Sequence, residues 1–236
     1  MAVQSAPAAD IVLVHGLFIG PWAWQPVIDC LEPDFTVYAP ELPFVSLQGD
    51  AQVVRQQVAA CRQAGRSVLL LGHSYGGMVI SEAGEEATEM AFLGALAPDP
   101  GQTTAGISEE CVSALCNQAT VTSDDGKTVT LDGPTTVAAF YHLCTPEQAA
   151  YGMARHRPAP ASIFLDPSRS PAWLRKPSTY IVTSEDRSVD PNYQRSRGSL
   201  MKATKTVIAD HSAFFSAPNE LAEVIAAIAR SCQLPG

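Results

Sequence analysis

The chain has 236 residues, of which 46% are hydrophobic and 17% are charged, and its formal net charge is -9. This composition is typical of a globular domain with a sizeable core, and not of a disordered chain. The negative charge and the lack of any run of lysine or arginine argue against a nucleic-acid-binding protein. No apolar run approaches the roughly 20 residues that span a bilayer, so we expect no membrane segment.

The N-terminus and the cysteines bear on the cellular compartment. The opening stretch MAVQSAPAADIVLVHG has no basic region and only a short apolar run, which predicts a short tail leading into a strand rather than a signal peptide. The chain has six cysteines and no CxxC pair, so we expect reduced thiols and a cytoplasmic location. A disulfide between Cys111 and Cys116 is the alternative.

Short apolar runs rich in β-branched residues alternate along the chain with stretches of helical spacing. The apolar runs lack polar alternation, as buried parallel strands do, and cover residues 10–15, 35–39, 67–71, 90–96, 179–183 and 205–209. Helical spacing occurs at residues 26–31, 50–63, 78–87 and 219–230. This alternation predicts an α/β protein with an open, mostly parallel sheet that carries helices on both sides.

The alternation stops between residues 98 and 177, a stretch rich in proline. Within it, Asp125-Gly126 lies between two threonine- and valine-rich runs and predicts a hairpin turn. Residues 136–151 have helical character, and Thr145-Pro146-Glu147 is typical of a helix start. We expect residues 98–177 to form a cap inserted into a single domain whose core is 1–97 and 178–236. The aromatic content of the insertion disfavours the alternative of a disordered linker.

The stretch LLLGHSYGGMV at residues 69–79 contains a GxSxG pattern centred on Ser74. A nucleophile elbow places its serine in a strained turn between a strand and a helix, so the positions two before and two after it must be small. Here those positions are Gly72 and Gly76, with a predicted strand before them and a predicted helix after them. The pattern predicts that Ser74 is a nucleophile.

A serine nucleophile needs a base and an acid that orients the base. DHSAFF places His211 directly after a predicted strand, and TSEDRSVDP places Asp186 after another. The chain order Ser74, Asp186, His211 is the order of nucleophile, acid and base in α/β sheets that carry a nucleophile elbow. The other candidate acids are Glu185, Asp190 and Asp99.

Backbone N–H groups and two further histidines are also candidates for a role in the site. HGLFIG follows the first predicted strand, so the backbone N–H of Leu17 could join that of Tyr75 in an oxyanion hole. We expect His15 and His73 to be structural, bonded to nearby loops. No His, Cys or Asp cluster has the spacing of metal ligands.

Four segments together resemble the α/β-hydrolase superfamily: HGLFIGPWAWQPVI, APELP, GHSYGGMVI and EDRSVDPNYQRS…ADHSAFFSAPNELAEVI. More narrowly, they resemble the small esterases and hydroxynitrile lyases that include plant methyl-ester esterases and their bacterial relatives. The resemblance covers nearly the whole chain and is weakest at 98–177. It implies a triad of Ser74, Asp186 and His211, with oxyanion amides from Leu17 and Tyr75. One departure is Phe44, because relatives usually carry glycine there.

The resemblance also separates two chemistries. Hydroxynitrile lyases of this type carry threonine in place of Gly16 and lysine in place of Ser212, whereas this chain has neither. We therefore predict a cofactor-free serine hydrolase that cleaves a small, rather apolar carboxylic ester. A carbon–carbon lyase using the same triad and a non-catalytic ligand-binding protein are the alternatives. The candidate substrate contacts are Phe18, Tyr141 and Phe164.

Overall fold

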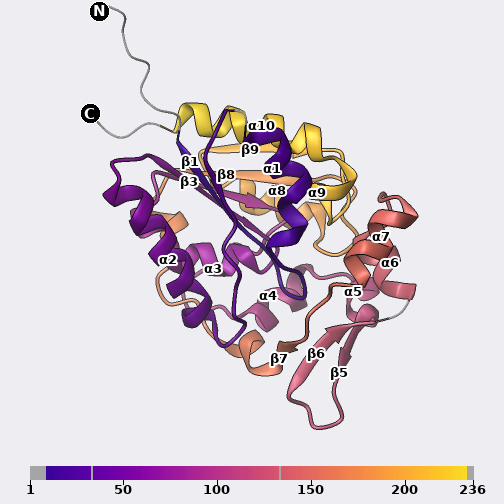
Figure 1. Cartoon of the computed structure of the whole chain (residues 1–236). Coiled ribbons are helices and arrows are strands. Elements are labelled where there is room, and N and C mark those ends of the chain that lie inside the picture. The colour runs from indigo at the N-terminus through magenta and orange to yellow at the C-terminus, as the bar shows by residue number, and fades with distance from the viewer. Residues whose placement is uncertain (1–8, 33, 133, 233–236) are drawn as a thin grey trace, which may run out of the picture.

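The fold is described by a computed structural model that covers residues 9–32, 34–132 and 134–232 (Figure 1). A six-stranded sheet with the order β2-β1-β3-β4-β8-β9 forms its centre, and every neighbouring pair is parallel. The strands are β1 (Asp10–Val14), β2 (Val37–Tyr38), β3 (Val68–His73), β4 (Glu89–Leu93), β8 (Ser178–Thr183) and β9 (Ala203–Val207). The predicted α/β fold with a mostly parallel sheet is confirmed.

The four inner strands are apolar because helices cover both of their faces. Every residue of β1, β3, β4 and β8 is buried, whereas β2 and most of β9 are partly or fully exposed. The predicted run 35–39 shortens to β2, and the predicted run 205–209 moves to β9. Both are edge strands with a single neighbour, so fewer ladder hydrogen bonds define their ends.

Alternate strand residues face opposite sides of the sheet and build two cores. Val12 and Val14 of β1 pack in the core on the side of α2, α3 and α8, whereas Ile11 and Leu13 pack in the core on the side of α1, α9 and α10. The helices are α1 (Gln25–Leu31), α2 (Leu47–Gln63), α3 (Gly76–Ala83), α8 (Pro191–Gly198), α9 (Ala213–Ser216) and α10 (Pro218–Ser231). Outside the stretch between β4 and β8, the 3₁₀ turns among the described residues are η1 (Pro21–Trp24) and η2 (Gly84–Glu86), and η likewise marks 3₁₀ turns below.

Most of the chain between β4 and β8 folds into short elements at one side of the molecule, and its last part runs back beside α3 (Figure 1). They are α4 (Thr104–Cys111), α5 (Ala114–Ala119), β5 (Thr120–Thr122), β6 (Thr128–Leu131), α6 (Pro134–Phe140), α7 (Pro146–Met153), β7 (Ala159–Pro160), η3 (Ala161–Leu165) and η4 (Ala172–Leu174). Strands β5, β6 and β7 form a second, antiparallel sheet.

Two local predictions in this stretch can be compared with the structure. The expected hairpin turn lies between β5 and β6, where Gly126 has a φ of 70°. The helical stretch expected over 136–151 is instead two helices, because the chain stops being helical after Phe140 and α7 starts afresh at Pro146. Proline cannot donate a backbone hydrogen bond to a preceding helical turn, so it favours the first position of a new helix.

The structure also bears on the expectations for membrane segments and disulfides. Within residues 9–32, 34–132 and 134–232, no helix has both the length and the apolar character needed to cross a bilayer. All six cysteines are free thiols, so Cys111 and Cys116 are not joined. The N-terminal tail expected before the first strand lies mostly outside the described residues.

The start of α7 provides a test of local stability. Thr145 is its N-cap: the threonine hydroxyl accepts from Gln148 N at 3.3 Å, and Gln148 Oε1 accepts from Thr145 N at 2.8 Å. We expect Thr145→Ala to lower the free energy of unfolding by about 1 kcal/mol, as measured by urea denaturation. Thr145→Ser keeps the hydroxyl and is the control. Equal losses in both variants would contradict the assignment of the cap.

Candidate active site

Ser74 lies in a sharp turn between β3 and α3, and its φ of 53° is in the left-handed region that residues with a side chain rarely adopt. A Cβ on Gly72 would lie 2.4 Å from the carbonyl oxygen of Gly76, and a Cβ on Gly76 would lie 2.6 Å from the carbonyl oxygen of Val14. The two glycines therefore let three backbone segments meet beneath the serine. This is the close packing that the GxSxG pattern predicts.

Two further candidates, Asp186 and His211, come together at the neighbouring strand ends. Asp186 follows β8 and His211 follows β9, and His211 Nδ1 lies 2.8 Å from Asp186 Oδ2. Both residues are buried, with 6% and 2% of their surface exposed. The predicted pairing of Asp186 with His211 is thus present in the geometry.

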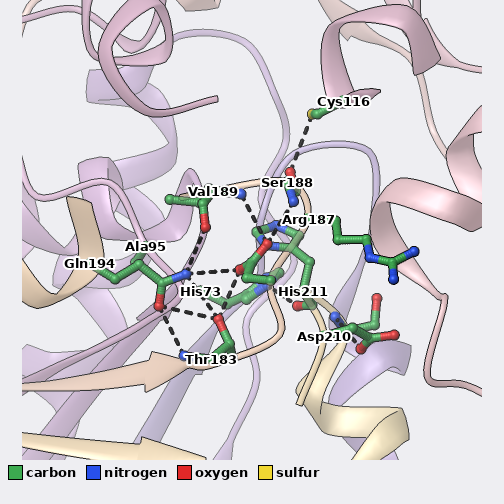
Figure 2. Close-up of polar contacts among 12 residues, drawn as sticks. His73, Ala95, Cys116, Thr183, Arg187, Ser188, Val189, Gln194, Asp210 and His211 are labelled. Atoms are coloured by element: carbon green, nitrogen blue, oxygen red, sulfur yellow. Dashed lines mark hydrogen bonds and ion pairs between the residues drawn. The ribbon is translucent and has the colours of Figure 1, made fainter. Parts of the chain in front are cut away.

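Four neutral donors fix the orientation of the Asp186 carboxylate. The backbone N–H groups of Ser188 and Val189 donate to Oδ1 at 2.8 and 2.9 Å. The Thr183 hydroxyl and the Gln194 amide donate to Oδ2 at 2.8 and 3.0 Å (Figure 2). Hydrogen bonds to a charged acceptor are stronger than those between neutral groups, so this set holds Oδ2 toward His211.

Sequence reasoning did not find Thr183 or Gln194. Thr183 is the last residue of β8, and Gln194 is a fully buried residue of α8. Gln194 Oε1 also accepts from Thr183 N at 2.9 Å, so its amide bridges strand and loop. No motif marks this glutamine, because its role depends on the packing of α8 against β8.

Gly94 follows β4 and leaves room for the side chain of Asp186. It has a φ of 48°, and a Cβ there would lie 2.9 Å from Thr183 Oγ1 and 3.1 Å from Asp186 Oδ2. The predicted strand 90–96 was therefore too long: β4 ends at Leu93, where the backbone turns away.

The rival acids are engaged elsewhere. Asp99 accepts two hydrogen bonds from the Arg197 guanidinium, at 3.0 and 3.1 Å. Asp190 caps α8 by accepting from Asn192 N at 2.7 Å, and the Glu185 side chain is exposed. Asp186 is the candidate that reaches His211.

The two histidines expected to be structural are neutral and bonded to backbone. His73 Nε2 donates to the carbonyl oxygen of His211 at 2.8 Å, and burial, followed by the charge of His211, holds the pKa of His73 well below its ordinary value. His15 Nδ1 lies 2.9 Å from the carbonyl oxygen of Gly16, and Leu42 N donates to His15 Nε2 at 3.1 Å. Burial lowers the pKa of His15 to about 4. Both rings therefore hold loops in place.

A second buried carboxylate supports the loop that carries His211. Asp210 accepts from Ser212 N at 3.0 Å and from Ser216 Oγ at 2.8 Å through Oδ1, and from Leu143 N at 2.9 Å through Oδ2. The loop after β9 is thereby tied to the segment between α6 and α7. Asp210 directly precedes His211 in the sequence, but nothing in the motif distinguished it from a surface acid.

A cavity of about 470 Å³ opens above Ser74 and His211. Leu17 and Tyr75, the expected oxyanion residues, line it, and so do the three expected substrate contacts Phe18, Tyr141 and Phe164. The Tyr141 hydroxyl lies 2.8 Å from His156 Nε2, so this ring is held at the cavity wall. Among the described residues, no hydrogen bond joins the side chains of Ser74 and His211.

The cavity lining is mainly apolar. Aromatic and aliphatic side chains dominate it, including Leu131, Phe140 and Phe214. Of the described residues that line it, none is lysine or arginine, and Glu109 is the one carboxylate. Within the described chain, no group of three histidine, cysteine, aspartate or glutamate residues is arranged to bind a metal.

Sequence comparisons agree with this architecture. The model of the alpha/beta hydrolase family matches residues 11–224. Esterase PIR7B of Oryza sativa subsp. japonica is 23% identical over 265 aligned positions, which cover 97% of this chain and 98% of the rice protein. Polyneuridine aldehyde esterase of Rauvolfia serpentina is 25% identical over 266 positions, covering 98% of this chain and 99% of that protein.

Solved structures have the same fold. The crystal structure of polyneuridine aldehyde esterase matches with a TM-score of 0.80 at 21% identity, covering 94% of this chain and 99% of the other. The pyrethroid hydrolase PytH matches with a TM-score of 0.79 at 23% identity, covering 94% and 97%. Because the family model spans most of the chain and the fold agrees, this protein belongs to the alpha/beta hydrolase family.

Proposed function

We propose that this protein is a serine hydrolase that cleaves a small, rather apolar carboxylic ester through an acyl-enzyme intermediate. In this proposal Ser74 is the nucleophile, His211 the general base and Asp186 the acid that orients it. The observation that carries it is the 2.8 Å contact between Asp186 Oδ2 and His211 Nδ1, beside a cavity that Ser74 and His211 both line. The esterase relatives support the same reaction class.

In the first step, His211 Nε2 accepts the proton of the Ser74 hydroxyl as the serine oxygen attacks the ester carbonyl. Asp186 accepts from Nδ1–H, so it selects the tautomer whose Nε2 is free and stabilises the imidazolium that forms. Binding of substrate, or a rotation of the Ser74 side chain, closes the contact between Ser74 and His211, since such contacts commonly tighten only in the complex.

The negative charge of the tetrahedral intermediate is stabilised by the backbone N–H groups of Leu17 and Tyr75. Tyr75 is the N-cap of α3, so its amide lies at the positive end of the helix dipole. Each such donor contributes about 3 kcal/mol to lowering the barrier. His211 then protonates the leaving alcohol, and water repeats the sequence to release the acid without any cofactor.

Gly16 and Ser212 favour hydrolysis over the lyase reaction. A Cβ on Gly16 would lie 2.9 Å from Ser74 Cβ and 3.2 Å from His73 Nδ1, so the threonine of the lyases does not fit here without a shift of the elbow. Ser212 lines the cavity next to His211 but carries no positive charge to stabilise a departing cyanide. A non-catalytic binding protein would have no need for the buried acid–base pair.

The cavity favours an uncharged substrate with an apolar body. Its volume of about 470 Å³ is large enough for a bulky acyl or alcohol group. Because its described lining carries no cation, an ester with a second, free carboxylate has no partner there.

The division into a core and a cap over residues 98–177, and the cytoplasmic location, remain predictions.

Replacing the nucleophile tests the reaction class. We expect Ser74→Ala to lower kcat for p-nitrophenyl acetate by at least about 10⁴-fold, since removal of a triad member leaves only binding and the oxyanion hole. Ser81→Ala, at a buried serine of α3 whose hydroxyl donates to Gly77 O, is the matched control and should retain activity. Wild-type turnover no faster than Ser74→Ala would refute the esterase, and cyanide release from mandelonitrile would favour the lyase.

Replacing the acid tests the triad itself. In Asp186→Asn, the side-chain oxygen must face the N–H groups of Ser188 and Val189, so the NH₂ group faces His211 Nδ1. The ring would then carry its proton on Nε2 and lose its function as base, and we expect kcat to fall about 10⁴-fold. Asp99→Asn at the rival acid is the control, measured in the same assay. A comparable loss in both variants would argue against the assignment of Asp186.

Glu109, at the exposed face of α4, tests charge selection. The two test substrates are the cation butyrylcholine and its uncharged isostere 3,3-dimethylbutyl butyrate. In Glu109→Gln the ratio of their kcat/KM values should fall by about 2- to 5-fold at low salt, and by less as salt screens the charge. Glu110→Gln, at an exposed neighbour outside the cavity lining, is the control. An unchanged ratio in Glu109→Gln would contradict the prediction.

A further inference from the structure

The first turn of α2 contains a carboxylate that the triad does not use. Asp50 is fully buried, which is rare for an aspartate because loss of hydration destabilises the charged form. Burial raises the pKa of Asp50 to about 6, against the opposing effects of its hydrogen bonds with Tyr75 and Phe44 and of the nearby Arg157 charge. A buried group of this kind must be held by specific partners, and both partners lead to the candidate oxyanion hole.

The first partner is Tyr75, the residue after the nucleophile. Its hydroxyl donates to Asp50 Oδ2 at 2.9 Å, and its ring is buried with 1% exposure. Tyr75 is therefore fixed at two ends: its backbone by the elbow and the start of α3, and its hydroxyl by α2. An amide whose residue is fixed in this way has little freedom to turn away from a developing charge.

The second partner is Phe44, the residue that departs from the glycine usual in relatives. Its N–H donates to Asp50 Oδ1 at 2.9 Å, and its φ is 55°. A left-handed phenylalanine costs roughly 1–2 kcal/mol of backbone strain, so the conformation must be held by its surroundings. The Asp50 hydrogen bond fixes the backbone, and the ring packs edge-on to His15, with centroids 5.6 Å apart, and under Arg157.

His15 carries this support to the first oxyanion loop. Its ring lies between Phe44 and the loop backbone, bonded to the carbonyl oxygen of Gly16 on one side and to Leu42 N on the other. Leu17, the second expected oxyanion donor, follows Gly16 directly. Both oxyanion amides are therefore connected to the same carboxylate, one through Tyr75 and the other through Phe44 and His15.

We propose that Asp50 is a positioning residue of the oxyanion hole, which holds the amides of Tyr75 and Leu17 through these two chains of contacts. This inference rests on the proposed function, because it assumes that the two amides bind the oxyanion. Asp50 acts through other residues and touches neither the substrate nor the reacting atoms.

Two substitutions at Asp50 separate positioning from charge. Asp50→Leu has the same number and branching of side-chain heavy atoms, although its methyl groups are larger than the carboxylate oxygens, and it removes both hydrogen bonds. Asp50→Asn retains both, since its oxygen accepts from Phe44 N and its NH₂ group donates to the Tyr75 oxygen.

The folded-state pKa of Asp50 lies above the ordinary value of 3.8, so ionisation destabilises the fold as pH rises through about 6. Asp50→Asn should therefore raise Tm at pH 8 by a few degrees, and the gain should shrink toward pH 4.

The expected kinetic result is a fall in kcat of about 10- to 100-fold for Asp50→Leu, less than the 10²- to 10³-fold loss of a whole oxyanion donor, with KM changed by less than about threefold. Asp50→Asn should keep kcat within about threefold of wild type. Inhibition by an aryl trifluoromethyl ketone, whose adduct with Ser74 carries an oxyanion, should weaken in Asp50→Leu by the same factor as kcat. Tyr75→Phe should lower kcat less, because it breaks one of the two chains.

Glu82 provides the matched control. This half-buried carboxylate of α3 accepts from Ser168 Oγ, Arg169 N and Gln48 Nε2, so it ties a loop and the first turn of α2 to α3 without a contact to the oxyanion residues. Glu82→Leu should lower Tm and leave kcat and ketone inhibition unchanged.

The outcomes separate the inference from the proposed function. If Asp50→Leu has the kcat and ketone affinity of the wild type, or if Glu82→Leu loses activity in parallel with its loss of Tm, the positioning role is refuted. If the wild type neither cleaves esters nor binds the ketone, the proposed function fails instead. If Asp50→Leu does not fold, Tyr75→Phe decides: kcat and ketone affinity equal to wild type in this variant would refute the inference.

Discussion

The left-handed backbone of Ser74 is the constraint on which the rest of the site depends. It turns the chain from β3 into α3 within a few residues, so the serine stands above the carboxyl edge of the sheet. The turn is possible only because Gly72 and Gly76 let the backbones of β1, β3 and α3 approach within contact distance. The sheet order places β1 and β3 side by side with β2 beyond β1, so the elbow lies where the strand order reverses, which is the usual position of a site in an open α/β sheet.

Asp186 and His211 are held in place by different partners. Asp186 and His211 lie just beyond β8 and β9, and the side-chain hydroxyl and amide of Thr183 and Gln194 fix the carboxylate without any cation (Figure 2). His211 is fixed from the other side by His73, which donates to its backbone carbonyl. A cation beside Asp186 would compete with the imidazolium for the carboxylate, whereas neutral donors leave His211 as its main charged partner.

The sequence was most informative where local pattern and global fold impose the same requirement. The inner strands and the glycines of GxSxG follow from rules that act over a few residues, and the structure has buried strands and a left-handed turn at these positions. The supporting groups were not predictable in this way. Gln194 and Asp50 are polar residues on helices, and in the sequence they look like ordinary solvent-facing positions. They are buried only because α8 packs on β8 and α2 lies beside α3. Phe44 was noticed as a departure, but its left-handed backbone and its packing against His15 need three-dimensional coordinates.

The residues around Ser74 and the wall of the cavity come from different parts of the chain, so substitutions in one need not disturb the other. Ser74, Asp186, His211 and their supports lie on the central sheet and its strand ends, where glycine contacts and buried hydrogen bonds leave little room for change. Much of the cavity wall comes from the stretch between β4 and β8, including Glu109, Leu131 and Phe164, where a change of side chain alters the shape or charge of the cavity without reaching the elbow. Asp210 connects the two parts, since one carboxylate oxygen bonds to the His211 loop and the other to the segment between α6 and α7. A shift of that segment would therefore disturb the hydrogen bonds of Asp210, the residue directly before His211.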